Sequence, residues 1–386
     1  NFMLTQSLDT QMREWRHDFH QHPELNFDLK YTSPKVAELL KNLGLETHEG
    51  IGHSGVVGIL KNGTGKKSIG IRADMDALPV QETNDLTYKS KNEGKMHACG
   101  HDGHMSMALG AAKFLSENKN FDGTVYFIFQ PDEEKTQGAQ AMIDDGLFSK
   151  FSIDEVYAFH NMPGMDLGTF ATRPGTITAS ESIFKIELWG QGGHSALPHM
   201  GVDTITVGTQ IITSLQSIVS RKLNPAMNGV VSVTDFKSNG NENVLPGHSV
   251  ITGDTRALSP EANKIIEASM KDIVQGVAAA HGIKVDFSYE TRTNMTINTQ
   301  DQTLAAAEVA SKMVGAKNVD ANCEPKLFSE DFSQMLMVKP GCFILIGNGL
   351  DGSHAQSLHS SNYNFNDELL VIGSTFWTEL VKKRLS

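Results

Sequence analysis

The sequence predicts an α/β protein with an open mixed sheet flanked by helices, into which a smaller ferredoxin-like α+β domain is inserted. The chain has 386 residues, more than a single hydrophobic core usually serves, so two domains are the default. Residues 123–129 (GTVYFIF) form a near-continuous apolar run, which is typical of a strand buried on both faces. Between residues 182 and 289 the pattern follows the order β-α-β-β-α-β of a ferredoxin-like sandwich.

The elements of the larger domain follow from hydrophobic spacing. Apolar residues at helical spacing, from Leu8 to Phe19, predict a first helix that ends near His22–Pro23, and a second helix stops at Gly44. A third helix is expected around residues 107–115, and residues 63–66 (GTGK) are expected to form a hairpin turn. Strands are expected at residues 56–60, 68–73, 123–129, 156–159 and 343–346.

The inserted domain is predicted from alternating strands and two helices. Its strands are expected at residues 182–188, 229–236, 249–255 and 283–289, and its helices at 204–219 and 262–280. We therefore place the inserted domain at residues 182–292, a size of about 110 residues that is ordinary for an independent domain. The larger domain then comprises residues 1–181 and 293–386.

Composition narrows the classes of partner. The net charge of −12 argues against nucleic acid or an anionic membrane, and no apolar run approaches the roughly 18 residues of a membrane helix. Three cysteines, at positions 99, 323 and 342, form no disulfide framework, which indicates a reduced, cytoplasmic protein. A small-molecule substrate is the expected partner.

Residues 97–105 (HACGHDGHM) are the strongest chemical signal. They hold three histidines, a cysteine and an aspartate, and Gly100 and Gly103 allow the backbone to turn tightly. Thiolate, imidazole and carboxylate are together the ligand set of zinc, manganese or cobalt, although a histidine cluster can also be a solvated turn. Cys99 and His101, two residues apart in a glycine turn, favour a metal site.

Acids and histidines also follow several predicted strands. Asp132, Glu133 and Glu134 come just after the apolar run at 123–129, where open α/β sheets place their ligands. The alternative is that these acids open the next helix. Asp74 and Asp76 lie on one face of extended chain, and His160 follows a fourth strand.

Two glycine-rich segments match nucleotide-binding motifs only in part. Residues 50–55 (GIGHSG) have the spacing of a dinucleotide fingerprint, but a strand follows them where a helix should begin. Residues 63–66 lack the upstream glycine of a phosphate loop, because position 60 is leucine. A nicotinamide-dependent oxidoreductase is therefore a minor alternative.

The motifs together resemble those of a known family. In chain order they are residues 16–25 (RHDFHQHPEL), the Asp74–Asp76 segment, the Cys99–His101 turn, Glu133–Glu134, His160, residues 192–195 (GGHS) and residues 358–360 (LHS). Across essentially the whole chain, the sequence resembles the metal-dependent N-acyl-amino-acid amidohydrolases of the carboxypeptidase G superfamily. These include hippurate hydrolases, bacterial aminoacylases and plant indole-acetyl-amino-acid hydrolases. The resemblance implies a two-metal, aminopeptidase-like catalytic domain and an inserted lid domain that forms a homodimer or higher oligomer.

The resemblance also assigns roles to residues. Glu133 would be the general base, with Asp76 in support, and two divalent ions per subunit are implied, manganese or zinc first and cobalt or nickel as alternatives. On the lid, His194 would help to polarise the scissile carbonyl, and with Asn243 and Arg256 it would bind substrate. The implied metal ligands are Cys99, His101, Glu134, His160 and His359. Many relatives have alanine at position 132 and a glycine-rich run at 135–138, so the extra acid and lysine here could alter substrate preference.

The function expected from these residues is hydrolysis of the amide bond of N-acyl amino acids to a carboxylic acid and a free amino acid. Metal ions would activate a water and Glu133 would accept its proton. His194 would stabilise the developing oxyanion, and Arg256 would hold the substrate carboxylate. The alternatives are a dipeptidase or carboxypeptidase with the same metal chemistry, and a non-catalytic binding protein.

Overall fold

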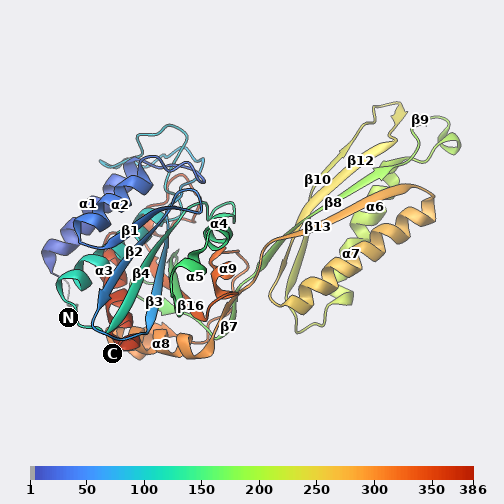
Figure 1. Ribbon diagram of the computed structural model, residues 1–386. Helices are drawn as coiled ribbons and strands as arrows, with labels where there is room; N and C mark the ends of the chain where they lie inside the picture. Colours follow the sequence, from blue (N-terminus) through green and yellow to red (C-terminus); the bar gives the residue numbers. More distant parts are fainter. Residues whose placement is uncertain (1–4) are drawn as a thin grey trace. The chain divides into compact units, whose positions relative to one another are not determined.

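The computed structural model describes residues 5–386, which fall into two compact units (Figure 1). The first unit takes in the chain up to Ile177, Ile297–Glu324 and Asp331–Ser386, and the second takes in Thr178–Thr296 and Pro325–Glu330. Residues 1–4, which the predicted catalytic domain includes, lie outside the described residues. Among the described residues, no helix has the length and apolar character needed to cross a membrane.

An eight-stranded mixed sheet forms the middle layer of the first unit. Its strands, in spatial order, are β1 (Glu46–Ile51), β2 (Gly55–Asn62), β4 (Gly123–Gln130), β3 (Ser68–Asp74), β5 (Glu155–Pro163), β16 (Gly341–Gly349), β6 (Phe170–Ala171) and β15 (Val319–Asp320). The neighbouring strands β4, β3, β5 and β16 run parallel. These central strands are buried almost throughout, as the apolar run at 123–129 predicts.

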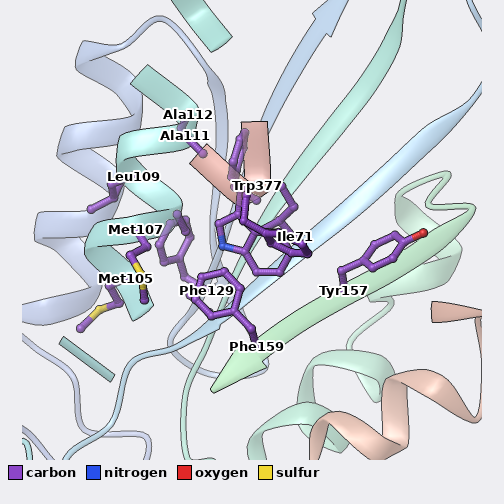
Figure 2. Close-up of a cluster of buried hydrophobic side chains, with 14 of the residues drawn as sticks. Ile71, Met105, Met107, Leu109, Ala111, Ala112, Phe129, Tyr157, Phe159 and Trp377 are labelled. Atoms are coloured by element: carbon purple, nitrogen blue, oxygen red, sulfur yellow. The ribbon is translucent and has the colours of Figure 1, made fainter. Parts of the chain in front are cut away.

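Helices cover both faces of this sheet (Figure 1). The larger layer holds α1 (Gln6–Gln21), α2 (Thr32–Asn42), α3 (His101–Glu117), α8 (Gln300–Val314) and α10 (Leu369–Arg384), and the other holds α4 (Gly138–Asp144), α5 (Leu147–Lys150) and α9 (Phe332–Leu336). Figure 2 shows part of the core beneath the larger layer, to which the strands contribute side chains such as Ile71 and Phe129 and α3 contributes Met105 and Met107. Phe159 of β5 stacks on Trp377 of α10 with ring centroids 4.2 Å apart. This packing fixes α3 against the strands whose ends carry the acids and histidines.

The strand order creates a switch point at β3. The chain passes from β3 to β4 on one side of it, and then to β5 on the other side. In open α/β sheets the crevice outside the carboxyl ends of the strands at such a point is the usual ligand site. The fold therefore predicts a ligand site at the residues that follow Asp74, Gln130 and Phe159.

The second unit has the predicted ferredoxin-like topology. Its sheet has the order β10 (Gly229–Ser238), β12 (His248–Ala257), β8 (Ser180–Trp189) and β13 (Lys284–Thr293), and all neighbours are antiparallel. α6 (Thr204–Leu215) and α7 (Pro260–His281) pack on one face of this sheet. A π-helical turn over Ile218–Lys222 ends the segment that was predicted as one helix to residue 219. At one end of the sheet, β9 (Gly193–His194) pairs with β11 (Val244–Leu245).

The hairpin predicted at residues 63–66 is wrong. β2 and β3 do not pair with each other, because β4 lies between them and pairs with both. The loop crosses the start of β4, where the side chain of Asp122 accepts hydrogen bonds from Thr64 N and Gly65 N at 3.0 and 2.7 Å. The remaining short segments are β7 (Gly175–Thr178), β14 (Thr296–Asn298) and the 3₁₀ turns Pro198–Met200, Ala316–Asn318 and Gly352–His354.

Candidate metal centre

The chemically reactive side chains of the first unit gather at the carboxyl ends of β3, β4 and β5. Asp74 is the last residue of β3, and Asp76 follows two residues later. Glu133 and Glu134 lie in a turn after β4, and α4 begins only at Gly138, so these acids do not open a helix. His160 lies within β5 itself.

The turn from Cys99 to His101 brings two donors to this edge. Gly100 has φ +87°, in the left-handed region that favours glycine, and α3 begins directly after it. A Cβ atom at Gly100 would lie 2.2 Å from the side-chain oxygen of Asn161, so a larger residue would displace β5 or the turn. The cysteine and the histidine are buried, which distinguishes this stretch from a solvated turn.

The five predicted ligands lie together. One ligand atom each of Cys99, Glu134 and His359 lie within 4.8 Å of one another, and Glu134 Oε2 is 3.2 Å from His359 Nε2. His101 Nε2 is 3.6 Å from Glu134 Oε1, and His160 Nε2 is 3.4 Å from Cys99 Sγ. Their role as ligands stays a prediction, but five residues from four separate segments converge on one small volume.

The histidine tautomers suit metal binding. His101 Nδ1 donates to the backbone oxygen of Asp76 at 2.7 Å, and His160 Nδ1 donates to that of Asn161 at 2.7 Å. Each bond leaves Nε2 as the atom that faces the other donors, which is the arrangement in which ligating histidines are usually held. His101 Nε2 and Glu134 Oε1 are buried without a hydrogen-bond partner. Since buried polar atoms are costly when unpaired, this donor set fits divalent cations.

Asp76 holds the turn that carries Glu133 and Glu134. Its two carboxylate oxygens accept hydrogen bonds from Glu133 N and Glu134 N at 3.1 and 3.0 Å. Oδ1 also lies 3.3 Å from His101 Nδ1. Burial raises the pKa of Asp76, and its bonds to His101 work in the opposite direction. The predicted supporting role of this residue therefore has a geometric basis, although its effect on catalysis stays a prediction.

The electrostatics of the centre favour cations. Burial alone would lower the pKa of His101, but the surrounding carboxylates, first that of Asp74, raise it to about 10. Burial raises the pKa of the Cys99 thiol well above its usual value, and Glu134 and Glu133 raise it further. A divalent ion would reverse both shifts, because it stabilises the thiolate and the neutral imidazole, so binding would release protons.

Two residues outside the predicted ligand set, Asp74 and His104, also belong to this centre. Donor atoms of Asp74 and His104 lie within 4.8 Å of those of His101 and His160. The signals were present: Asp74 is two residues before Asp76, and His104 belongs to the metal-like stretch. Asp102, one of the residues left outside the ligand set, accepts from Arg16 of α1 at 3.0 Å and anchors the start of α3.

The predicted substrate residues belong to the second unit, which brings only two of them together. His194 lies on β9, and the adjacent Ser195 N donates to the backbone oxygen of Asn243 at 3.1 Å. Arg256 lies near the other end of β12, where its guanidinium pairs with Glu181 at 2.8 Å and with Asp254 at 3.0 Å. The eight residue steps along β12 from His248 to Arg256 correspond to about 26 Å. His194 and Arg256 of one chain are therefore too far apart to contact one small substrate.

Comparison with known proteins agrees with this geometry. Residues 70–383 match the family model described as peptidase family M20/M25/M40. The chain is 40% identical to the hippurate hydrolase of Campylobacter jejuni, over 99% of both chains. It is 33% identical to the IAA-amino acid hydrolase ILR1-like 2 of Arabidopsis thaliana, over 96% of this chain and 84% of the relative.

Solved structures support the same assignment. The YXEP protein of Bacillus subtilis, a dinuclear metal binding peptidase from the M20 family, superposes with a TM-score of 0.87 at 29% identity, and the match covers 99% of both chains. The resemblance and the fold class inferred from the sequence are thus confirmed. The chain belongs to peptidase family M20/M25/M40 and is a metal-dependent amidohydrolase.

Proposed function

We propose that this enzyme hydrolyses the amide bond of N-acyl amino acids with the help of two divalent ions. The observation that carries the proposal is the convergence of Cys99, His101, Glu134, His160 and His359 around buried, unpartnered ligand atoms, with Glu133 beside them. Relatives described as hippurate hydrolase and as N-acetylcysteine deacetylase support this substrate class. Manganese or zinc suits the mixed thiolate, imidazole and carboxylate donors.

We assign the roles of the side chains from their positions in the metal centre and, for His194 and Arg256, from the family resemblance. Divalent ions held by the five donors would lower the pKa of a water and neutralise charge that develops on the carbonyl oxygen. Glu133, with Oε2 3.7 Å from His101 Nε2, is placed to accept the proton of that water and to return it to the leaving nitrogen. Asp76 would keep the glutamate turn and His101 in register through the hydrogen bonds described above. His194 would donate to the carbonyl oxygen as its negative charge develops, and Arg256 would bind the carboxylate of the amino-acid half.

The separation of His194 from Arg256 supports a homodimer. A second copy could supply His194 to the substrate that Arg256 holds, which removes the need for one chain to span about 26 Å. Mixing two inactive variants, His194→Ala and Glu133→Gln, under conditions that exchange subunits should restore activity that neither has alone. Equal inactivity of the mixture and of each variant would contradict a shared site.

The reduced, cytoplasmic setting expected from the cysteines agrees with three buried free thiols.

A substrate panel tests the proposed function. The purified protein is assayed on N-acetyl, N-benzoyl and indole-acetyl amino acids and on matched dipeptides, each with added manganese, zinc or cobalt. We expect hydrolysis of N-acyl amino acids at rates well above those on dipeptides. Exclusive cleavage of dipeptides or longer peptides would instead favour a dipeptidase or carboxypeptidase. A relative that is 35% identical to this chain is described as thermostable carboxypeptidase 2.

A further inference from the structure

We infer that Asp74 and His104 are positioning residues that hold the two metal-binding histidines, His101 and His160, in the geometry needed for high metal affinity. The inference rests on the proposed function, because it assumes that these histidines bind metal. Asp74 and His104 belong to a buried polar network that contacts both histidines.

Asp74 is the centre of this network. It is the last residue of β3 and is completely buried. Oδ1 accepts from His104 Nδ1 at 2.6 Å, and Oδ2 accepts from the guanidinium of Arg72 at 3.3 Å. Oδ2 also lies 3.2 Å from His101 Nε2. Arg72 is itself fixed by Asp331 at 3.0 Å and by the side-chain oxygen of Gln130 at 2.8 Å, so Asp74 is held between a fixed cation and the histidines.

His104 extends the network from β3 to β5. It lies one helical turn after His101 on α3, so both side chains project from the same face. Its Nε2 contacts the side-chain oxygen of Asn161 at 2.8 Å, and Asn161 is the residue whose backbone oxygen receives His160 Nδ1. Asn161 in turn donates to the hydroxyl of Tyr363. The chain of contacts therefore joins the helix that carries one ligand to the strand that carries another.

A direct role as ligands is the competing interpretation, since Asp74 and His104 lie close enough to the histidines to bind an ion with them. The hydrogen bonds favour positioning. Both ring nitrogens of His104 already contact protein acceptors, and both oxygens of Asp74 are engaged. Among the predicted ligands, by contrast, His101 Nε2 and Glu134 Oε1 are free of hydrogen bonds. Residues that orient ligands in this way usually contribute 10–100-fold to metal affinity.

The test is the metal affinity of Asp74→Asn, measured in the full-length protein. The dissociation constants of manganese and zinc are determined by competition with a chromophoric chelator, and stoichiometry by elemental analysis at saturating metal. We expect a dissociation constant raised about 10–100-fold, with the same number of ions bound at saturation. His104→Gln receives the same measurements, so that the inference can be judged even if Asp74→Asn does not fold.

Glu155→Gln is the matched control. Glu155 is another buried carboxylate paired with an arginine, Arg384, at 2.6 Å, but it lies at the opposite end of β5 from His160. This variant should lose unfolding stability while its metal dissociation constant stays unchanged. An unchanged affinity in both Asp74→Asn and His104→Gln would overturn the inference. One ion fewer at saturation would also overturn it, because the residue would then be a ligand. Failure of the proposed function appears elsewhere, as wild-type protein that binds metal but leaves N-acyl amino acids intact.

Discussion

Replacing Asp76 by asparagine should show how strongly its carboxylate holds the turn that carries Glu133 and Glu134. The carboxylate accepts one hydrogen bond from Glu133 N and one from Glu134 N, and an amide of the same size has only one acceptor oxygen. One buried backbone N–H then loses its partner, at a cost of about 1–3 kcal/mol of unfolding free energy. A shift of the turn on the order of 1 Å would also misplace the general base, and such a shift costs about 100-fold in rate.

The assay combines urea unfolding with steady-state kinetics on an N-benzoyl amino acid. Asp132→Asn is the control, because Asp132 lies in the same turn and is buried, yet neither of its carboxylate oxygens has a hydrogen-bond partner. Burial raises the pKa of Asp132 to about 7, so at neutral pH an amide removes only part of a negative charge and no hydrogen bond. We expect Asp76→Asn to lose about 100-fold in kcat while Asp132→Asn stays within a few-fold of wild type. Equal kinetics for wild type and Asp76→Asn would refute the bracing role.

Three further outcomes follow from the structure. Burial would raise the pKa of Glu155, but hydrogen bonds from Arg384 and Gln302 lower it overall. The ionised Glu155 therefore stabilises the folded state at pH values above the ordinary glutamate pKa. This contribution is lost as the pH falls through the lower pKa of the folded state. Urea unfolding should therefore show the largest deficit of Glu155→Gln at neutral pH and a smaller one in acid; a deficit independent of pH would contradict this. Gly192→Ala would place a Cβ atom 2.6 Å from the backbone oxygen of Leu245, whereas a Cβ atom at Gly193 meets nothing within 4 Å. We therefore expect a reduced kcat for Gly192→Ala and a near-normal kcat for Gly193→Ala. Equal kcat values for the two variants would argue against a fixed backbone geometry next to His194. Removal of metal with a chelator should lower the free energy of unfolding. The expected decrease is about 2.7 kcal/mol for each ion whose free concentration was a hundred times its Kd. An unchanged melting temperature after chelation would count against bound metal.

Much of the fold could be predicted because its signals are local and strong. The apolar run at 123–129 is long enough to require burial on both faces, and the alternation between residues 182 and 289 reproduces the order of elements in the second unit. The loop at residues 63–66 shows the limit. Turn residues indicate where a chain bends, but the strand that pairs next is decided by contacts distant in sequence, and here β4 lies between β2 and β3.

The candidate site shows the same division. Residue type and spacing indicated Cys99, His101 and the acids that follow residues 123–129, and the full set of five donors came from the family resemblance. The supporting role of Asp76 was implied by the resemblance, but the contact of Asp74 with His104 and the hydrogen bonds from Glu133 N and Glu134 N to Asp76 are visible only in the structure. The separation of His194 from Arg256 likewise depends on strand lengths and pairing in the second unit, which no motif encodes.

The most direct test of metal-dependent hydrolysis with Glu133 as general base compares the wild-type protein with Glu133→Gln. Elemental analysis and turnover of an N-benzoyl amino acid are measured on the same samples, before and after treatment with a chelator. We expect two divalent ions per chain in both proteins, and hydrolysis only in the metal-bound wild type. Full activity of the chelated enzyme, or unchanged turnover in Glu133→Gln with its metal intact, would contradict this mechanism.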